Sequence, residues 1–126
     1  MLRKSVIIFL GLGVVLLISG CIQEKNYTNP VFEPVLADPT VIKADDGSFY
    51  AYGTEDAWGE ETDTKLIPIV RSQNLTDWEY VGEAFEQKPD WKQTGGLWAP
   101  DITKINNQYY LYYSYSVWGT PIRELV

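Results

Sequence analysis

The sequence predicts an all-β chain that forms part of a β-propeller. β-branched and aromatic residues cluster in short runs broken by turn residues, and no apolar set recurs at the three- and four-residue spacing of a helix. Two aromatic runs also repeat: "FYAYGT" begins at Phe49 and "YYLYYS" at Tyr109, 60 residues later. The proline-flanked acids Asp38 and Asp101 lie 63 residues apart. A repeat of this length, containing about four strands, is typical of one propeller blade.

Six strands are expected along the chain, each bounded by turn-forming residues. They are residues 40–43, 49–54, 67–72, 79–85, 102–105 and 109–117. The pairs Asp46-Gly47 and Asn106-Asn107 suit the tight turns of β-hairpins, because Asn, Asp and Gly tolerate the left-handed backbone that these turns need. We therefore expect antiparallel hairpins at both places.

The last strand is apolar or aromatic on both faces, with Tyr109, Leu111 and Tyr113 on one and Tyr110 and Tyr112 on the other. Such a strand is expected to be covered on both sides, as in a blade packed between two neighbours. A two-layer sandwich is the alternative, although its strands usually keep one polar face. The sequence therefore favours one full blade and part of a second.

The N-terminus has the pattern of a secretory signal peptide, predicted to span residues 1–20. Arg3 and Lys4 give a basic start, and residues 6–18 are almost wholly apolar. This apolar stretch is short for a membrane-spanning helix. The ending "LISGC" resembles the lipobox of prokaryotic lipoproteins, which implies that Cys21 is lipidated. An uncleaved N-terminal anchor is the alternative.

Two further regions are expected after the signal peptide. Residues 21–30 are polar and form a tether, and residues 31–126 form the β-domain. Either reading of the N-terminus places this domain outside the cytoplasm and attached to the membrane. Each buried CH₂ of an acyl chain contributes about 0.8 kcal/mol to membrane binding.

Composition excludes several classes of function. The chain has no histidine, which rules out His-based catalytic triads and His-ligated metals within it, and its single cysteine cannot form an internal disulfide. Removing Arg3 and Lys4 leaves 8 basic against 17 acidic residues, a net charge of −9. Such a chain repels nucleic acid, so a neutral partner is expected.

Three segments carry a resemblance to a known family: "ADPTV", "VRSQNLTDW" and "WAPDITKINNQYYLYYSYSVWG". They resemble the N-terminal part of glycoside hydrolase family 43, especially its endo-arabinanase-like members, over Val31 to Gly119. The resemblance implies a five-bladed propeller that hydrolyses arabinan or a related pentose polysaccharide with inversion. It implies no cofactor within this chain and a calcium ion only in the full-length fold.

The resemblance also implies roles for three residues. Asp38 matches the general base, which deprotonates the attacking water in inverting hydrolysis. Trp98 matches an aromatic platform for the sugar, and Asp101 is expected at the cavity wall as a substrate contact. The alternatives are structural: a turn residue at Asp38, packing between blades at Trp98, and hydrogen bonding to the backbone at Asp101.

The family's acid and the Asp that tunes its pKa are expected in later blades. We therefore expect residues 31–126 to be a truncated N-terminal part of the domain that is inactive alone. A non-catalytic carbohydrate-binding lipoprotein and a gene remnant are the alternatives. The acidic segment 55–65 lacks the spacing of a calcium loop, so no metal is expected there and the segment is interpreted as a solvated rim loop. Substrate contact by its Trp58 is a further alternative.

Overall fold

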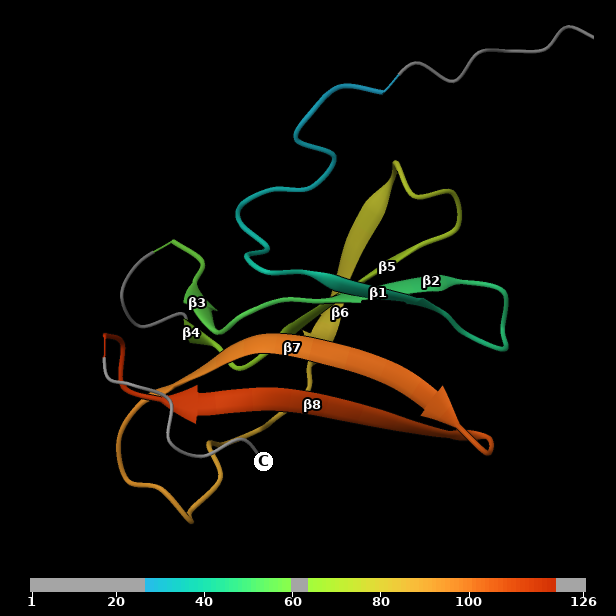
Figure 1. Ribbon diagram of the computed structural model, residues 1–126. Coiled ribbons are helices and arrows are strands. Elements are labelled where there is room, and N and C mark those ends of the chain that lie inside the picture. Colours follow the sequence, from blue (N-terminus) through green and yellow to red (C-terminus); the bar gives the residue numbers. More distant parts are fainter. Residues whose placement is uncertain (1–26, 60–63, 120–126) are drawn as a thin grey trace, which may run out of the picture.

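The computed structural model describes residues 27–59 and 64–119 (Figure 1). All regular structure in this part of the chain is β-strand, which confirms the all-β prediction. No helix long and apolar enough to span a membrane occurs in it. The strands are β1 (Thr40–Lys43), β2 (Phe49–Tyr52), β3 (Asp56–Ala57), β4 (Thr64–Lys65), β5 (Pro68–Ser72), β6 (Trp78–Glu83), β7 (Gly96–Ile105) and β8 (Gln108–Ser116).

Four strands form one antiparallel sheet in the order β1-β2-β5-β6, and β3 and β4 form a separate short hairpin between β2 and β5. Val41 of β1 pairs with Ala51 of β2, which pairs with Val70 of β5. Alternating strand residues share a face, so this row brings apolar side chains to one face of the sheet. This chain-order connectivity is the one expected of a propeller blade.

The remaining strands, β7 and β8, form a long hairpin that lies against the first sheet, with β7 nearest to β1 (Figure 1). Asn106 and Asn107 both have positive φ, 48° and 65°, and connect Ile105 to its partner Gln108. Two consecutive left-handed residues are the signature of a type I′ turn. The hairpin predicted at this asparagine pair is therefore confirmed.

Strand β7 begins at Gly96, so the prediction of a strand that starts only at residue 102 is wrong. Proline cannot donate a ladder hydrogen bond, so Pro100 hides the continuation of this strand through "WAPD". The register shifts between Trp98 and Asp101, so Ala99 and Pro100 form a bulge. Proline is tolerated at bulges, and the strand therefore continues through it.

The core lies between the first sheet and the hairpin. Ile67, Leu97 and Tyr115 are buried and in mutual contact, and the partly buried Phe85 and Tyr113 pack around them. The rings of Phe85 and Tyr113 meet edge to face with centroids 5.1 Å apart. Full burial of a Leu or Ile side chain contributes about 1.5–3 kcal/mol. This cluster joins the two sheets into one body.

The two faces of β8 differ in exposure. Tyr113 and Tyr115 face the core, whereas Tyr110 and Tyr112 are 40% and 49% exposed. The expectation that both faces are covered is therefore wrong for the part of the chain that the structure describes. The physical reason is that the hairpin packs against the first sheet on one side alone.

Candidate functional site

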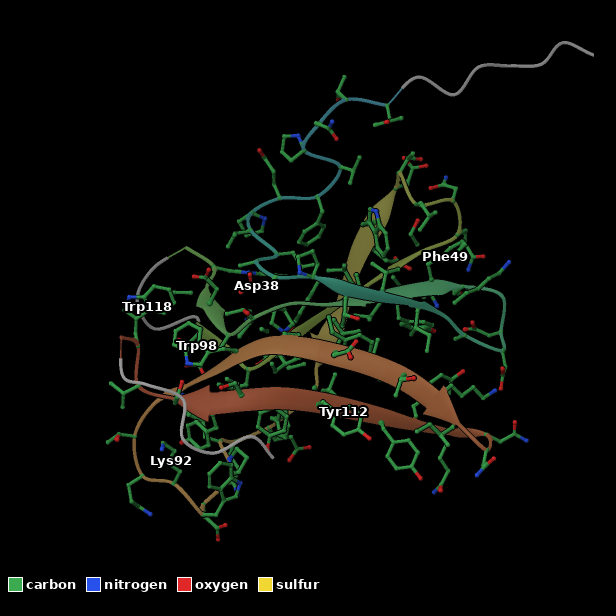
Figure 2. The ribbon with its side chains drawn as sticks, in the orientation of Figure 1. Asp38, Phe49, Lys92, Trp98, Tyr112 and Trp118 are labelled. Atoms are coloured by element: carbon green, nitrogen blue, oxygen red, sulfur yellow. The ribbon has the colours of Figure 1, made fainter. Side chains whose placement is uncertain are left out.

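The candidate site is an open pocket of about 430 Å³ near the point where β1 and β7 approach one another. Figure 2 shows Asp38, Trp98 and Trp118 at the same end of the molecule. The lining residues are Ala37, Asp38, Thr54, Glu55, Asp56, Ala57, Thr64, Trp98 and Trp118. The structure thus brings together two of the predicted site residues, Asp38 and Trp98, which are 60 positions apart in the chain.

Asp38 is held in an uncommon backbone conformation just before β1. Its φ is 47°, in the left-handed region that Asp tolerates better than most residues, and Pro39 follows it. Its side chain is exposed to the pocket, and Oδ2 accepts a hydrogen bond of 2.9 Å from Oγ1 of Thr54. Non-glycine residues in this region are typical of functional sites, where the surrounding contacts offset about 1–3 kcal/mol of strain.

The same backbone step occurs at Ala99. Its φ is 45°, it precedes Pro100, and its N–H donates 2.9 Å to Oγ1 of Thr54. Asp38-Pro39 therefore corresponds to Ala99-Pro100, an offset of 61 residues. The interpretation of Asp38 and Asp101 as equivalent acids 63 residues apart is wrong, because the offset of 61 residues aligns Asp101 with Thr40.

Asp101 lies opposite Thr40, the first residue of β1. Oγ1 of Thr40 donates to Oδ1 of Asp101 at 3.4 Å and accepts from the N–H of Ile102 at the same distance. Asp101 is not among the residues that line the pocket. These contacts join β1 to β7 and support the structural alternative for Asp101, while its contact with substrate stays a prediction.

Trp98 is half-buried and lines the pocket. Its Nε1 donates 2.7 Å to the carbonyl of Ser116, which fixes the plane of the ring. A Cβ added at Gly96 would lie 2.5 Å from Cζ2 of Trp98, so a side chain there would displace the ring. Glycine at this position therefore makes room for the indole.

Trp118 is a second aromatic residue at the pocket, and the sequence analysis missed it. Its ring centroid lies 5.5 Å from that of Trp98, and its side chain is 83% exposed. The available signal was its position in "SVWG", directly after the aromatic strand. Two adjacent indoles offer a broad apolar surface, which suits the C–H faces of a sugar chain.

Glu55 contradicts the interpretation of residues 55–65 as wholly solvated. Its side chain is largely buried, Oε1 pairs with Nζ of Lys88 at 2.5 Å, and Oε2 accepts 2.9 Å from the N–H of Leu97. The N–H of Glu55 also donates to the carbonyl of Leu97 at 2.9 Å. Glu55 therefore fastens the start of β7 next to Trp98, while residues 60–63 of this segment lie outside the described residues.

Trp58, in the same segment, packs away from the pocket lining. Its ring lies 5.5 Å from that of Phe32 and 5.1 Å from that of Tyr80. These contacts favour a packing role over contact with substrate. In the ranges 27–59 and 64–119, no group of three or more acidic, His or Cys side chains is arranged to hold a metal ion. Cys21 lies outside these ranges.

A second open pocket, of about 350 Å³, includes Tyr50, Tyr109 and the carboxylates of Asp45 and Asp46. These carboxylates are already paired. The N–H of Ser48 and the hydroxyl of Tyr50 donate to Asp46 and hold its pKa below the usual range. Nζ of Lys104 binds Asp45, and this bond raises the lysine pKa. The polar groups here satisfy one another, so this pocket is the weaker candidate.

Comparisons with known proteins agree with the all-β fold. The model of "Glycosyl hydrolases family 43" matches residues 27–123. The extracellular endo-alpha-(1->5)-L-arabinanase 1 of Bacillus subtilis is 32% identical over 92 residues, which are 68% of this chain and 27% of that protein. The extracellular exo-alpha-(1->5)-L-arabinofuranosidase ArbA of Cellvibrio japonicus is 39% identical over 59 residues, 42% of this chain and 17% of that protein.

A similar solved structure is that of Cellvibrio cellulosa alpha-L-arabinanase complexed with arabinohexaose. It is 29% identical with a TM-score of 0.57, over 70% of this chain and 27% of that one. These similarities define the class as the glycoside hydrolases. The chain belongs to glycosyl hydrolase family 43, and the predicted resemblance is confirmed. It spans 17% and 27% of the lengths of the two curated relatives.

Proposed function

We propose that the described residues form the first blade and the beginning of the second blade of a five-bladed propeller that hydrolyses arabinan-type polysaccharides. The four-stranded sheet and the β7-β8 hairpin support this arrangement, as does the repeated X-Pro step at Asp38 and Ala99. The observation that carries the proposal is that Asp38 and Trp98 line the same pocket. The alpha-L-arabinanase solved with arabinohexaose supports an arabino-oligosaccharide as the ligand.

Asp38 is the general base of this proposal. Inverting hydrolysis needs a carboxylate that deprotonates water, about 6.5–9.5 Å from an acid that protonates the leaving oxygen. Thr54 occupies Oδ2 of Asp38, and Oδ1 makes no hydrogen bond to another described residue. Oδ1 is therefore the oxygen that receives the proton from water.

The general acid comes from outside the described residues. Glu55 and Asp56 are the other carboxylates at the pocket. Both oxygens of Glu55 are engaged by Lys88 and Leu97, and Oδ1 of Asp56 accepts 2.8 Å from the N–H of Ala57. Glu55 is therefore not free to protonate a leaving group, whereas Asp56 keeps Oδ2 without a hydrogen bond to another described residue. We propose that neither is the acid and that the 126-residue chain alone binds the sugar without cleaving it.

Sequencing of the gene downstream of codon 126 tests the source of the acid. The expected result is an in-frame continuation with further strands and with an Asp and a Glu for the tuning and acid roles. If no such continuation exists, yet the chain releases sugar from arabinan, the acid lies within these residues and this part of the proposal fails. Sugar binding without any hydrolysis or continuation would favour a carbohydrate-binding lipoprotein. A chain that shows no cooperative unfolding transition would favour a gene remnant.

Asp38→Asn is expected to lower arabinan hydrolysis by the intact gene product by about 10²–10⁴-fold. Asparagine keeps the size of the side chain and the acceptor for Thr54 but cannot take a proton from water. Release of reducing sugar from linear arabinan measures this effect, and calorimetry with arabinohexaose should show a Kd within about twofold of wild type.

The matched control for this change is Asp90→Asn, the same substitution outside the pocket lining. It is expected to change hydrolysis by less than about threefold, because Asp90 is exposed and is not among the pocket-lining residues. Equal losses in the two variants would contradict the assignment of the base to Asp38.

We also propose that the protein acts outside the cytoplasm, held to the membrane by lipid on Cys21. The curated relatives are extracellular, and the "LISGC" motif supplies the acceptor cysteine. Cys21→Ser is expected to abolish incorporation of labelled fatty acid and to leave the signal peptide uncleaved, because the thiol is the site of lipid attachment. Metabolic labelling and mass spectrometry of the mature N-terminus measure both effects. Wild-type protein that carries no lipid and retains residues 1–20 would instead support an uncleaved anchor.

A further inference from the structure

Thr54 links the two X-Pro steps at the pocket. It follows β2, is only 4% exposed, and lines the same pocket as Asp38. Its Oγ1 lies 2.9 Å from Oδ2 of Asp38 and 2.9 Å from the backbone nitrogen of Ala99. Its own N–H donates 2.9 Å to the carbonyl of Ala37. One buried hydroxyl therefore contacts both inner segments of the site.

The direction of these hydrogen bonds follows from the chemistry of the groups. The N–H of Ala99 can only donate, so it uses a lone pair of the Thr54 hydroxyl. The hydroxyl has a single proton, and the carboxylate of Asp38 can only accept when ionised. The proton of Thr54 must therefore point at Asp38, and consecutive bonds of this kind polarise and strengthen one another.

We propose that Thr54 is a positioning residue for Asp38, through a relay from the Ala99 N–H to the Thr54 hydroxyl and on to Oδ2. The relay fixes the carboxylate rotamer and leaves Oδ1 to the attacking water. It also makes the orientation of Asp38 depend on the bulge in β7. The inference rests on the proposed role of Asp38 in hydrolysis.

A purely structural threonine would accept the hydrogen bond from the Ala99 N–H without any effect on the base. The relay differs because the charge of Asp38 then affects the hydrogen bond of the Ala99 N–H through the shared Thr54 hydroxyl. Ionisation of Asp38 strengthens the Thr54 bond, and the oxygen of Thr54 then becomes a better acceptor for the Ala99 N–H. The amide proton of Ala99 should therefore shift as Asp38 titrates.

Nuclear magnetic resonance on the isotope-labelled 126-residue chain tests this coupling without requiring hydrolysis. In wild type and Thr54→Ser, the Ala99 amide proton is expected to move with the carboxyl carbon of Asp38, with the same midpoint. In Thr54→Val the carboxyl still titrates, but the amide response falls to less than about a third. An unchanged response in Thr54→Val, or no response in wild type, would overturn the relay.

Other charged groups near this site also titrate or carry charge: Glu55, Asp56, Lys88 and Asp101. Asp38→Asn separates the effect of Asp38 from the effects of these groups, because it removes the titration of Asp38 and leaves the other groups unchanged. The Ala99 response is expected to vanish in this variant and to survive in Asp101→Asn. Asp38 is exposed, so this test does not depend on whether Thr54→Val folds.

The consequence for catalysis is measured on the intact gene product with arabinohexaose. Thr54→Val is expected to lower kcat by about 10–100-fold with KM within about threefold, and Thr54→Ser is expected to restore kcat to within about threefold. Full kcat in Thr54→Val would refute the positioning role while leaving the proposed function intact. Absence of arabinan hydrolysis in wild type would refute the function, and the resonance experiment would still decide the relay.

Discussion

Leu97→Ala is expected to destabilise the protein by about 2–5 kcal/mol, the range for removing a buried leucine side chain. Leu97 is completely buried and packs against Ile67 and Tyr115 where the two sheets meet. Domains of this size have total stabilities of about 5–15 kcal/mol, so the loss is a large fraction. Urea unfolding followed by tryptophan fluorescence and circular dichroism measures it.

Leu75→Ala is the matched control for this prediction. It deletes the same atoms from a side chain that is 46% exposed, so the cost is expected to stay below about 1 kcal/mol. A difference between the variants of less than about 1 kcal/mol would contradict the core assignment. Both variants keep the backbone contacts of their positions, which makes the comparison one of burial alone.

Trp98→Ala is expected to weaken binding of arabinohexaose by at least about tenfold, or about 1.4 kcal/mol. The ring is fixed by its hydrogen bond to Ser116 and lies beside Trp118 in the pocket, an arrangement that supports the proposed stacking on a sugar. Loss of the Trp98 ring removes one of the two indoles that offer apolar surface in the pocket. Titration calorimetry of the wild-type and variant chains gives the two dissociation constants.

Trp91→Ala is the control with the same chemistry at another place. Trp91 packs edge to face on Tyr115, with centroids 5.1 Å apart, and is not among the pocket-lining residues. Its loss is expected to change the sugar Kd by less than about twofold. Similar weakening in both variants would mean that general destabilisation, and not the pocket, governs binding.

Much of the fold could be predicted because strand signals are local. A dense run of aromatic residues and the asparagine pair defined β8 and its turn directly from neighbouring positions. The start of β7 could not be predicted in this way, because Pro100 normally ends a strand and only the pairing with β8 reveals the bulge. Exposure of Tyr110 and Tyr112 likewise depends on what packs beside the strand, which periodicity does not specify.

The candidate site was predicted in part for the same reason. Asp38 and Trp98 carry recognisable local motifs, and the structure places both at one pocket. Thr54 carries no such signal, since its partners lie 16 and 45 residues away in the chain. The offset of Asp101 was misjudged because the two acids lie on opposite sides of their prolines: Asp38 precedes Pro39, whereas Asp101 follows Pro100.

The exposed rings of Tyr110 and Tyr112 have a consequence for the colloidal behaviour of the described fold. Figure 1 shows β8 on the side of β7 opposite to β1. Among the described strands, β8 is hydrogen-bonded to β7. The outer edge of such a strand can form backbone hydrogen bonds with a strand of another molecule. The formal net charge of −7 opposes such contacts by long-range repulsion. Because salt screens this repulsion beyond about 10 Å at 0.1 M, the ionic strength of the medium controls how closely two copies approach.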